Sequence, residues 1–267
     1  MKKVEIKMKT PISYYGGKQS MLKHILPMIP RHMTYVEPFF GGGAVFWAKP
    51  QSEVEIINDY NANVANFYVQ LKTNFKALKI LIDATPYCRE VYQRAVVIYN
   101  TPYIFTEVHR AWAFWIGCIQ GFSNQIGSWR SSQLRNKENL LNFNKKVAFT
   151  EAFSKRLDLI QIEQRDAVYL IKRLDSVDTF FYIDPPYVNA NQGHYGGYTQ
   201  AHFDELLEAL TTIKGKFLLS SYPNESLENY RKANSWSSND KDMCLSASNS
   251  KKRKTEALTH NYDLNSI

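Results

Sequence analysis

Short apolar runs that end at polar or glycine-rich segments mark the first part of the chain. Residues 34–38 and 53–57 are mostly apolar, and three glycines follow the first run. Such runs are typical of buried strands that end in loops. Residues 44–48 leave room for a short helix between them. A longer helix is predicted after the second run from apolar residues spaced by three and four, namely Val64, Phe67, Tyr68 and Leu71.

The alternation of strands and helices resumes at residue 179. Residues 179–183 form a continuous apolar run, which is typical of a strand buried on both faces of a parallel sheet. Pro185 and Pro186 end this strand because proline donates no ladder hydrogen bond. Further elements are predicted downstream: a helix over 202–213, a strand over 216–221, and an antiparallel pair around 243–247 and 257–262.

A long segment separates these two halves and has a mostly helical pattern. The sequence therefore predicts an α/β protein with a doubly wound, Rossmann-like sheet. Residues 1–71 and 161–267 form its sheet domain, and residues 72–160 form an inserted helical domain. The insertion places aromatic side chains beside basic ones, and segments carried on a rigid scaffold often serve recognition.

Composition favours a polyanionic partner. The net charge is +8 and the pI is about 9.2, and basic residues gain from binding phosphates by counterion release. The 14% aromatic content suits stacking on bases, or simply an aromatic core. The longest uncharged apolar stretch, residues 111–119, is too short to span a membrane. Glu5, Lys7 and Lys9 interrupt any signal-peptide core, so we expect a cytoplasmic protein without a membrane segment.

The tetrad Asp184-Pro185-Pro186-Tyr187 follows the predicted strand at its carboxyl end, where open α/β sheets bind ligands. An exocyclic amine on a base is a poor nucleophile because its lone pair is delocalised into the ring. Asp184 and the Pro185 carbonyl could each accept one amine hydrogen. Pro186 would help to stiffen this turn, and Tyr187 could stack on an extruded base. The alternative is a rigid proline turn that only caps a strand.

A second motif, residues 37–43, combines a strand end with three glycines at which backbone can approach a ligand closely. Gly41 and Gly43 fit the first two positions of the dinucleotide fingerprint, but Phe46 occupies the third, which disfavours hydride transfer. Asp59 ends the next strand and is placed to accept the ribose hydroxyls of a bound adenosine. Taken alone, this aspartate would be a cap or turn residue.

A third segment, Tyr14-Tyr15-Gly16-Gly17-Lys18, precedes the first strand. Lys18 could contact a cofactor carboxylate or a DNA phosphate, or it could be solvated as most lysines are. With residues 37–43, the run Asn58-Asp59-Tyr60-Asn61 and the tetrad, this order and spacing resembles the Dam-type, or D12 class, DNA adenine methyltransferase family. The resemblance extends from about residue 11 to residue 262 and includes a similar ending at 254–262.

The resemblance implies transfer of a methyl group from S-adenosyl-L-methionine to the N6 amine of adenine in double-stranded DNA, by base flipping and direct in-line transfer. It implies no metal and a monomer or weak dimer. Asp184, Pro185, Pro186 and Tyr187 would be catalytic. The implied cofactor contacts are Tyr14, Lys18, Glu37, Phe39, Gly41, Gly43, Asp59, Asp166 and Asp184.

The resemblance also implies that the inserted segment recognises the target site. GATC-specific members carry Asn-Gly-x-x-Arg-Tyr-Asn, which residues 120–130 do not reproduce, so GATC specificity is not implied. Arg130 is the main candidate for a base or phosphate contact, since arginine commonly reads guanine. It could instead stack on Trp129 or pair with an acid. The candidate DNA contacts are Asn124, Trp129, Arg130 and Lys252, the last in a basic run that could also be a solvated turn.

Two alternatives remain open from the sequence. The tetrad alone also suits a methyltransferase that acts on the N4 amine of cytosine or on RNA, because both present an exocyclic amine. A catalytically silent nucleic-acid-binding relative would keep the same fold, although the intact glycines and the intact Asp184 argue against it.

Overall fold

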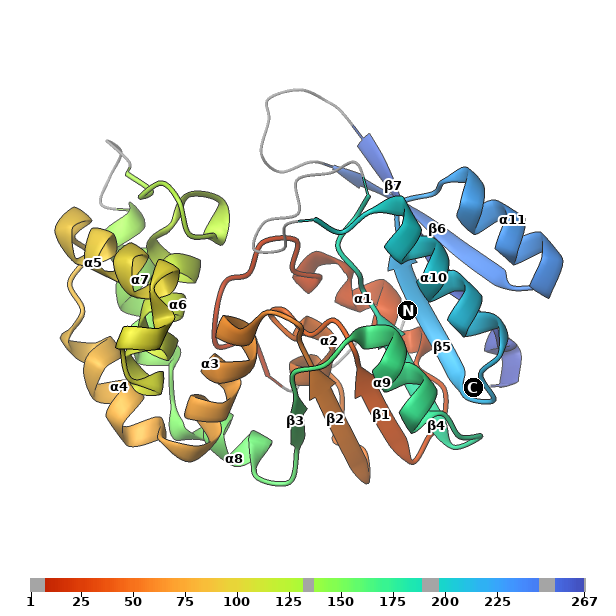
Figure 1. The fold of residues 1–267 in the computed structure, drawn as a ribbon, viewed down its shortest axis with the longest axis horizontal. Helices are drawn as coiled ribbons and strands as arrows, with labels where there is room; N and C mark the ends of the chain where they lie inside the picture. The colour runs from red at the N-terminus through yellow and green to blue at the C-terminus, as the bar shows by residue number, and fades with distance from the viewer. Residues whose placement is uncertain (1–7, 132–136, 189–196, 245–252, 267) are drawn as a thin grey trace.

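A mixed sheet forms the centre of the protein (Figure 1). The computed structural model describes residues 8–131, 137–188, 197–244 and 253–266. Within these ranges, seven strands pair in the order β3-β2-β1-β4-β5-β7-β6. Their bounds are β1 Thr34–Glu37, β2 Val54–Asn58, β3 Gln161–Glu163, β4 Thr179–Ile183, β5 Lys216–Ser221, β6 Ser237–Cys244 and β7 Arg253–His260. All pairs are parallel except β5 with β7 and β6 with β7, so the predicted α/β class is confirmed.

Helices cover both faces of this sheet, because the alternating side chains of its strands point to opposite sides. In β4, Phe180 and Tyr182 join one buried cluster, and Phe181 and Ile183 join the other. The first face is covered by α1 Leu22–Ile25, α2 Ala44–Ala48 and α3 Ala62–Thr73, and α6 Glu107–Gln120 joins the same buried cluster by packing on α3. The second face is covered by α9 Ala167–Leu174, α10 Gln200–Thr211 and α11 Glu225–Asn234.

The inserted segment is helical, as its sequence predicts, and it stands beside the β3 edge of the sheet (Figure 1). Its remaining helices are α4 Phe75–Ala84, α5 Arg89–Asn100, α7 Lys137–Ala148 and α8 Glu151–Leu157. Short 3-10 turns complete the chain: η1 Gln19–Met21, η2 Leu26–Met28, η3 Pro102–Ile104, η4 Phe122–Asn124 and η5 Leu264–Ser266. No helix in the described ranges is long and apolar enough to cross a membrane.

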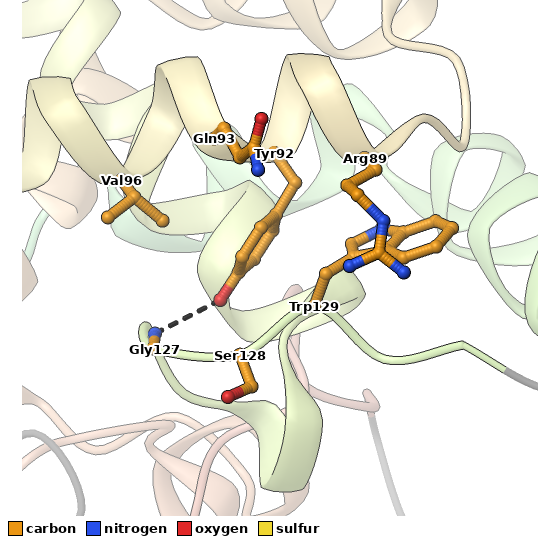
Figure 2. A pocket seen from close by; sticks show the side chains of 7 residues that line it. All are labelled: Arg89, Tyr92, Gln93, Val96, Gly127, Ser128 and Trp129. Carbon is orange, nitrogen blue, oxygen red and sulfur yellow. Dashed lines mark hydrogen bonds between the residues drawn. The ribbon is translucent and has the colours of Figure 1, made fainter.

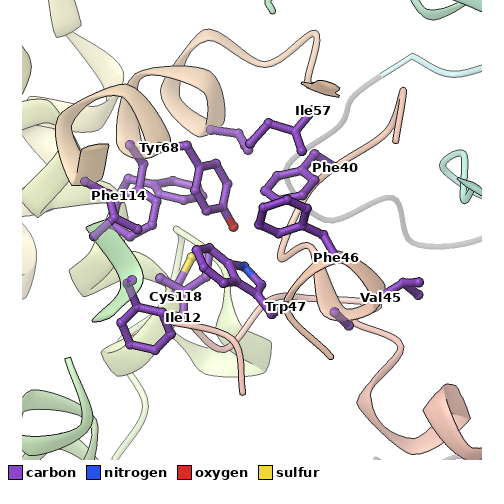
Figure 3. Close-up of a cluster of buried hydrophobic side chains, with 14 of the residues drawn as sticks. Ile12, Phe40, Val45, Phe46, Trp47, Ile57, Tyr68, Phe114 and Cys118 are labelled. Carbon is purple, nitrogen blue, oxygen red and sulfur yellow. The ribbon is translucent and has the colours of Figure 1, made fainter. Parts of the chain in front are cut away.

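One continuous buried cluster joins the helical segment to the sheet. Phe114 and Cys118 of α6 pack beside Tyr68 of α3 and Trp47 of α2 (Figure 3). A buried ion-pair group adds to this contact at the amino end of β2, where Glu55 pairs with Lys49 and with Arg156 of α8. The helices are therefore anchored firmly beside the sheet. The proposed domain boundaries at residues 72 and 160 stay a prediction.

Candidate functional site

Acidic side chains follow four adjacent strands at their carboxyl ends. Glu37 ends β1, Asp59 follows β2, Asp166 lies beyond β3 and Asp184 follows β4. The chain leaves β1 toward β2 and β3 on one side, whereas β4 continues to β5 on the other. The topological switch point therefore lies between β1 and β4, which is where doubly wound sheets bind their ligands.

A buried ion pair links the N-terminal segment to the end of β4. Nζ of Lys18 lies 2.7 Å from Oδ1 of Asp184, and it also donates to the Gly16 carbonyl at 3.2 Å. Burial raises the pKa of Asp184 to about 6, against the lowering effect of Lys18. Burial by itself lowers the pKa of Lys18, but Asp184 and Glu256 raise it, so that the net shift is upward. Both groups are therefore charged at neutral pH.

Tyr187, the last residue of the tetrad, turns its hydroxyl toward the sheet. The hydroxyl lies 3.3 Å from Oδ1 of Asp184 and 3.3 Å from Oγ of Ser220 on β5, and it donates to Oε1 of Glu256 on β7. The Tyr187 ring lies 4.2 Å from the ring of Tyr222, measured between centroids. Nζ of Lys18 lies 4.8 Å from the same ring centroid. The end of the tetrad is thus part of a buried polar network.

The glycine turn after β1 lies directly against Tyr14. Gly41 and Gly43 adopt φ values of +47° and +62°, in the left-handed region that favours glycine. A Cβ at Gly41 would lie 2.7 Å from Cε1 of Tyr14. A Cβ at Gly43 would lie 2.3 Å from Cζ of Phe40. The close packing explains why this turn needs residues without side chains.

Asp59 is buried and fixed by backbone amides of two segments. Its Oδ2 accepts from Gly41 N at 2.8 Å, and its Oδ1 accepts from Asn61 N at 2.9 Å. The neighbouring Asn58 donates to the Pro38 carbonyl at 2.8 Å and accepts from Arg165 N at 2.8 Å. Asn58 and Asp59 therefore hold together the loops that follow β1, β2 and β3.

The other predicted cofactor contacts border this region. Glu37 is buried and accepts from the Tyr35 hydroxyl at 2.7 Å, and burial raises its pKa to about 8. Phe39 lies edge-on to Tyr198, with ring centroids 6.1 Å apart. Asp166 is exposed and caps α9 by accepting from the Tyr169 amide at 2.8 Å. The roles of these residues in binding stay predictions.

Arg130 has partners inside the helical segment. Its Nη2 donates to Oδ1 of Asn124 at 2.6 Å and to the Gly121 carbonyl at 3.0 Å. Its Nη1 lies 3.5 Å from Oε2 of Glu138. Of the interpretations that the sequence leaves open, the structure contains the ion pair with an acid. Arg130 and Asn124 also brace the turn that they share, and their contact with DNA stays a prediction.

The Trp129 ring is in contact with Arg89 rather than with Arg130. The Arg89 guanidinium carbon lies 4.7 Å from the centroid of the Trp129 ring, at one side of a pocket of about 340 Å³ between α5 and residues 127–129 (Figure 2). Tyr92 lines this pocket and its hydroxyl accepts from the Gly127 amide at 3.0 Å. No carboxylate in the described ranges pairs with the exposed Arg89. The fourth candidate, Lys252, lies outside the described residues.

Comparison with models of protein families shows which family this chain belongs to. Residues 14–258 match the model of the D12 class N6 adenine-specific DNA methyltransferases. The chain belongs to this family. The match runs from Tyr14 to Leu258 and includes both sheet halves and the helical segment between them.

Three relatives of this D12 class chain differ in length. It is 26% identical to the type II methyltransferase M1.LlaDCHI of Lactococcus lactis subsp. cremoris, over 76% of this chain and 74% of that protein. It is 24% identical to the modification methylase StsI of Streptococcus sanguinis, over 67% of this chain and 29% of that protein. It is 27% identical to the DNA N-6-adenine-methyltransferase of Escherichia phage P1, over 64% of this chain and 23% of that protein. The chain thus spans less than a third of two of these relatives.

Sequence reasoning missed several side chains that the structure brings into contact with predicted site residues of this D12 class chain. Ser220, Glu256 and Arg89 carry no motif of their own that would indicate their partners. Glu256 does lie in residues 254–258, which resemble the C-terminal sequence of the family. That resemblance marked its position but did not indicate a role for its side chain. Asn58 likewise precedes Asp59 in a quoted motif, and its structural contacts explain why an amide stands there.

Proposed function

We propose that this protein transfers a methyl group from S-adenosyl-L-methionine to the N6 amine of adenine in double-stranded DNA. The observation that carries this proposal is the position of Asp184 at the switch point of the sheet. Its Oδ1 meets Lys18 at 2.7 Å, whereas no side chain or amide in the described ranges donates to Oδ2. An acid with one engaged oxygen and one available oxygen is suited to accept a hydrogen bond from an amine.

The residues around the glycine turn fit a nucleoside cofactor. Gly41 and Gly43 form a turn of bare backbone packed against Tyr14 and Phe40, and the buried Asp59 stands at the next strand end, where an acid can accept ribose hydroxyls. Glu37 and Tyr14 border the same turn, and Asp166 stands one strand further along. S-adenosyl-L-methionine would supply an electrophilic methyl group here.

The tetrad would orient the target amine. Asp184 accepts one amine hydrogen and the Pro185 carbonyl accepts the other, which turns the nitrogen lone pair toward the methyl group. Pro185 and Pro186 restrict the backbone, so that this carbonyl is held before the substrate arrives. The adenine must leave the duplex to reach Asp184, and Tyr187 would stack on it. Orientation and preorganised charge would provide most of the rate enhancement.

The helical segment would hold the DNA. The exposed guanidinium of Arg89 lies over Trp129 without an acidic partner in the described ranges, which suits contact with a phosphate or a base. We favour Arg89 as the first phosphate contact to test, because the guanidinium of Arg130 already has three partners within its own segment.

Asp184→Ala tests the proposal directly. The wild-type protein, incubated with labelled S-adenosyl-L-methionine and DNA, should label DNA, and nucleoside digestion should yield N6-methyladenine. The variant should lose transfer by at least about 100-fold while its circular dichroism stays unchanged. Full activity of the variant would overturn the mechanism, and N4-methylcytosine as product would overturn the substrate.

A further inference from the structure

Glu256 is a buried carboxylate in the middle of the polar network beneath the tetrad. It lies on β7, and only 4% of its surface is exposed. Its Oε1 accepts from the hydroxyls of Tyr187 and Ser220 and lies 3.8 Å from Nζ of Lys18. A buried carboxylate is stable only with such partners. These three partners, Tyr187, Ser220 and Lys18, all lie on segments that border Asp184.

Asp184 and Glu256 share two of their donors. Oδ1 of Asp184 contacts both Nζ of Lys18 and the Tyr187 hydroxyl, and Oε1 of Glu256 contacts the same two groups. A carboxylate that accepts several strong hydrogen bonds has less electron density to offer a further donor. The hydrogen bond that Glu256 takes from Tyr187, and its ion pair with Lys18, therefore leave Asp184 a better acceptor for an amine.

We infer that Glu256 is a positioning residue for methyl transfer. Together with Ser220 it holds the Tyr187 hydroxyl and shares Lys18, and so keeps Asp184 available to the target amine. This inference rests on the proposed function. We assign Glu256 no direct contact with the substrate, because its carboxylate is buried and is engaged by the hydroxyls of Tyr187 and Ser220.

Charged and titratable groups face Asp184 from every neighbouring element. They are Lys18 before η1, Glu37 on β1, Tyr182 on β4, Tyr187 after β4 and Glu256 on β7, and Tyr222 after β5 lies against the Tyr187 ring. Burial raises the pKa of Asp184 to about 6, Lys18 lowers it, and the negative charge of Glu256 raises it again. Removing that charge should therefore make Asp184 more acidic.

Glu256→Gln removes the charge but keeps an oxygen that can accept from Tyr187 and Ser220. We expect the acid limb of kcat to move to lower pH by about half a unit or more, with KM for DNA unchanged. Glu256→Asp keeps the charge but withdraws the carboxylate, so kcat should fall on the order of 10-fold through loss of the hydrogen bond to Tyr187, without a shift of the pH profile. If Glu256 had only a structural role, Glu256→Gln would not shift the acid limb of kcat, and the two variants would not differ in this way.

Glu55→Gln is the matched control, because Glu55 is equally buried and paired but lies at the amino end of β2. It should lower the melting temperature and leave the pH profile of kcat in place. If Glu256→Gln fails to fold, Glu256→Asp decides: a wild-type kcat in that variant overturns the inference. An active wild type with an unshifted Glu256→Gln profile overturns the inference alone, whereas an inactive wild type overturns the proposed function and the inference together.

Discussion

Asp184 and Lys18 are 166 positions apart in the chain, yet they form the central ion pair of the site. The ion pair is more than a surface contact, because both side chains are largely buried. Motif spacing could indicate that both residues bind something, but only the fold shows that they bind each other. The same holds for Glu256, whose partners Tyr187, Ser220 and Lys18 lie on three different segments.

The pKa of Asp184 makes methyl transfer depend on pH. Because only the carboxylate accepts the amine hydrogen, kcat should fall as the pH drops through about 6, by about 10-fold per unit below it. Lys18 lowers this pKa, so Lys18→Met should move the acid limb to higher pH. Rates measured from pH 5 to 8 at saturating cofactor test both points. An identical limb in the variant would contradict the assigned ion pair.

Glu37 should make stability depend on pH in the opposite sense to an ordinary surface acid. Its pKa rises from 4.5 to about 8 on folding, so the folded state holds the proton more tightly. The favourable contribution is complete below about 4.5 and is lost as the pH rises through about 8. Glu37→Gln should therefore raise the free energy of unfolding at pH 9 by about 2 kcal/mol. Urea titrations at pH 5 and pH 9 would measure this, and equal gains at both would argue against a protonated Glu37.

At the scale of elements, apolar runs in the sequence were sufficient to predict those strands that are buried on both faces. The runs at 34–38, 53–57, 179–183 and 216–221 became strands within one residue of the predicted ends. The helix predicted over 202–213 begins two residues earlier, because Thr199 and His202 form a capping box. The predicted closing pair is antiparallel, but β6 begins already at Ser237.

β3 and α11 are among the elements that escaped prediction, each for a physical reason. β3 has three residues at a half-exposed edge, too few for a periodic pattern. In α11 the helix side chains are mostly polar, and Leu227 is its one buried residue among those described. The N-cap Asn224, followed by Glu225 in the first turn, was the available signal for this helix.

The glycine turn is an element whose shape we expect to control cofactor binding. Gly41→Ala adds a Cβ that meets Tyr14 and strains a left-handed residue. We expect at least 10-fold weaker binding of S-adenosyl-L-methionine by calorimetry, beyond a loss of about 1 kcal/mol in stability. Gly197→Ala is the control, because it has φ +86° with open space around its Cβ. It should lose stability only, and comparable binding losses in both variants would contradict the assignment of this turn.

At the scale of the whole molecule, the order of sheet halves and helical segment followed from the sequence. The continuous core between Phe114 on α6 and Tyr68 on α3 did not, because the partners of buried aromatic residues depend on packing rather than on spacing. Of the two alternatives to a DNA contact for Arg130, the structure contains the ion pair, with Glu138, whereas the Trp129 ring is contacted by Arg89, which the sequence did not indicate.

Arg89→Ala tests whether the helical segment holds DNA. Loss of one phosphate contact should weaken DNA binding and reduce the slope of log K against log salt by about one. Arg94→Ala is the matched control, because Arg94 lies on the same helix and already pairs with Glu90. Its effect should be smaller at every salt concentration. Equal effects of the two variants would remove Arg89 from the DNA contact.

Single-molecule sequencing of DNA from cells that express the wild-type protein, compared with cells that express Asp184→Ala, tests the central claim most directly. It reports which base is modified and in which sequence context. The proposed function predicts N6-methyladenine at a defined site in the wild-type sample and none in the variant sample. Modified cytosine, or no modified base in the presence of folded wild-type protein, would contradict it.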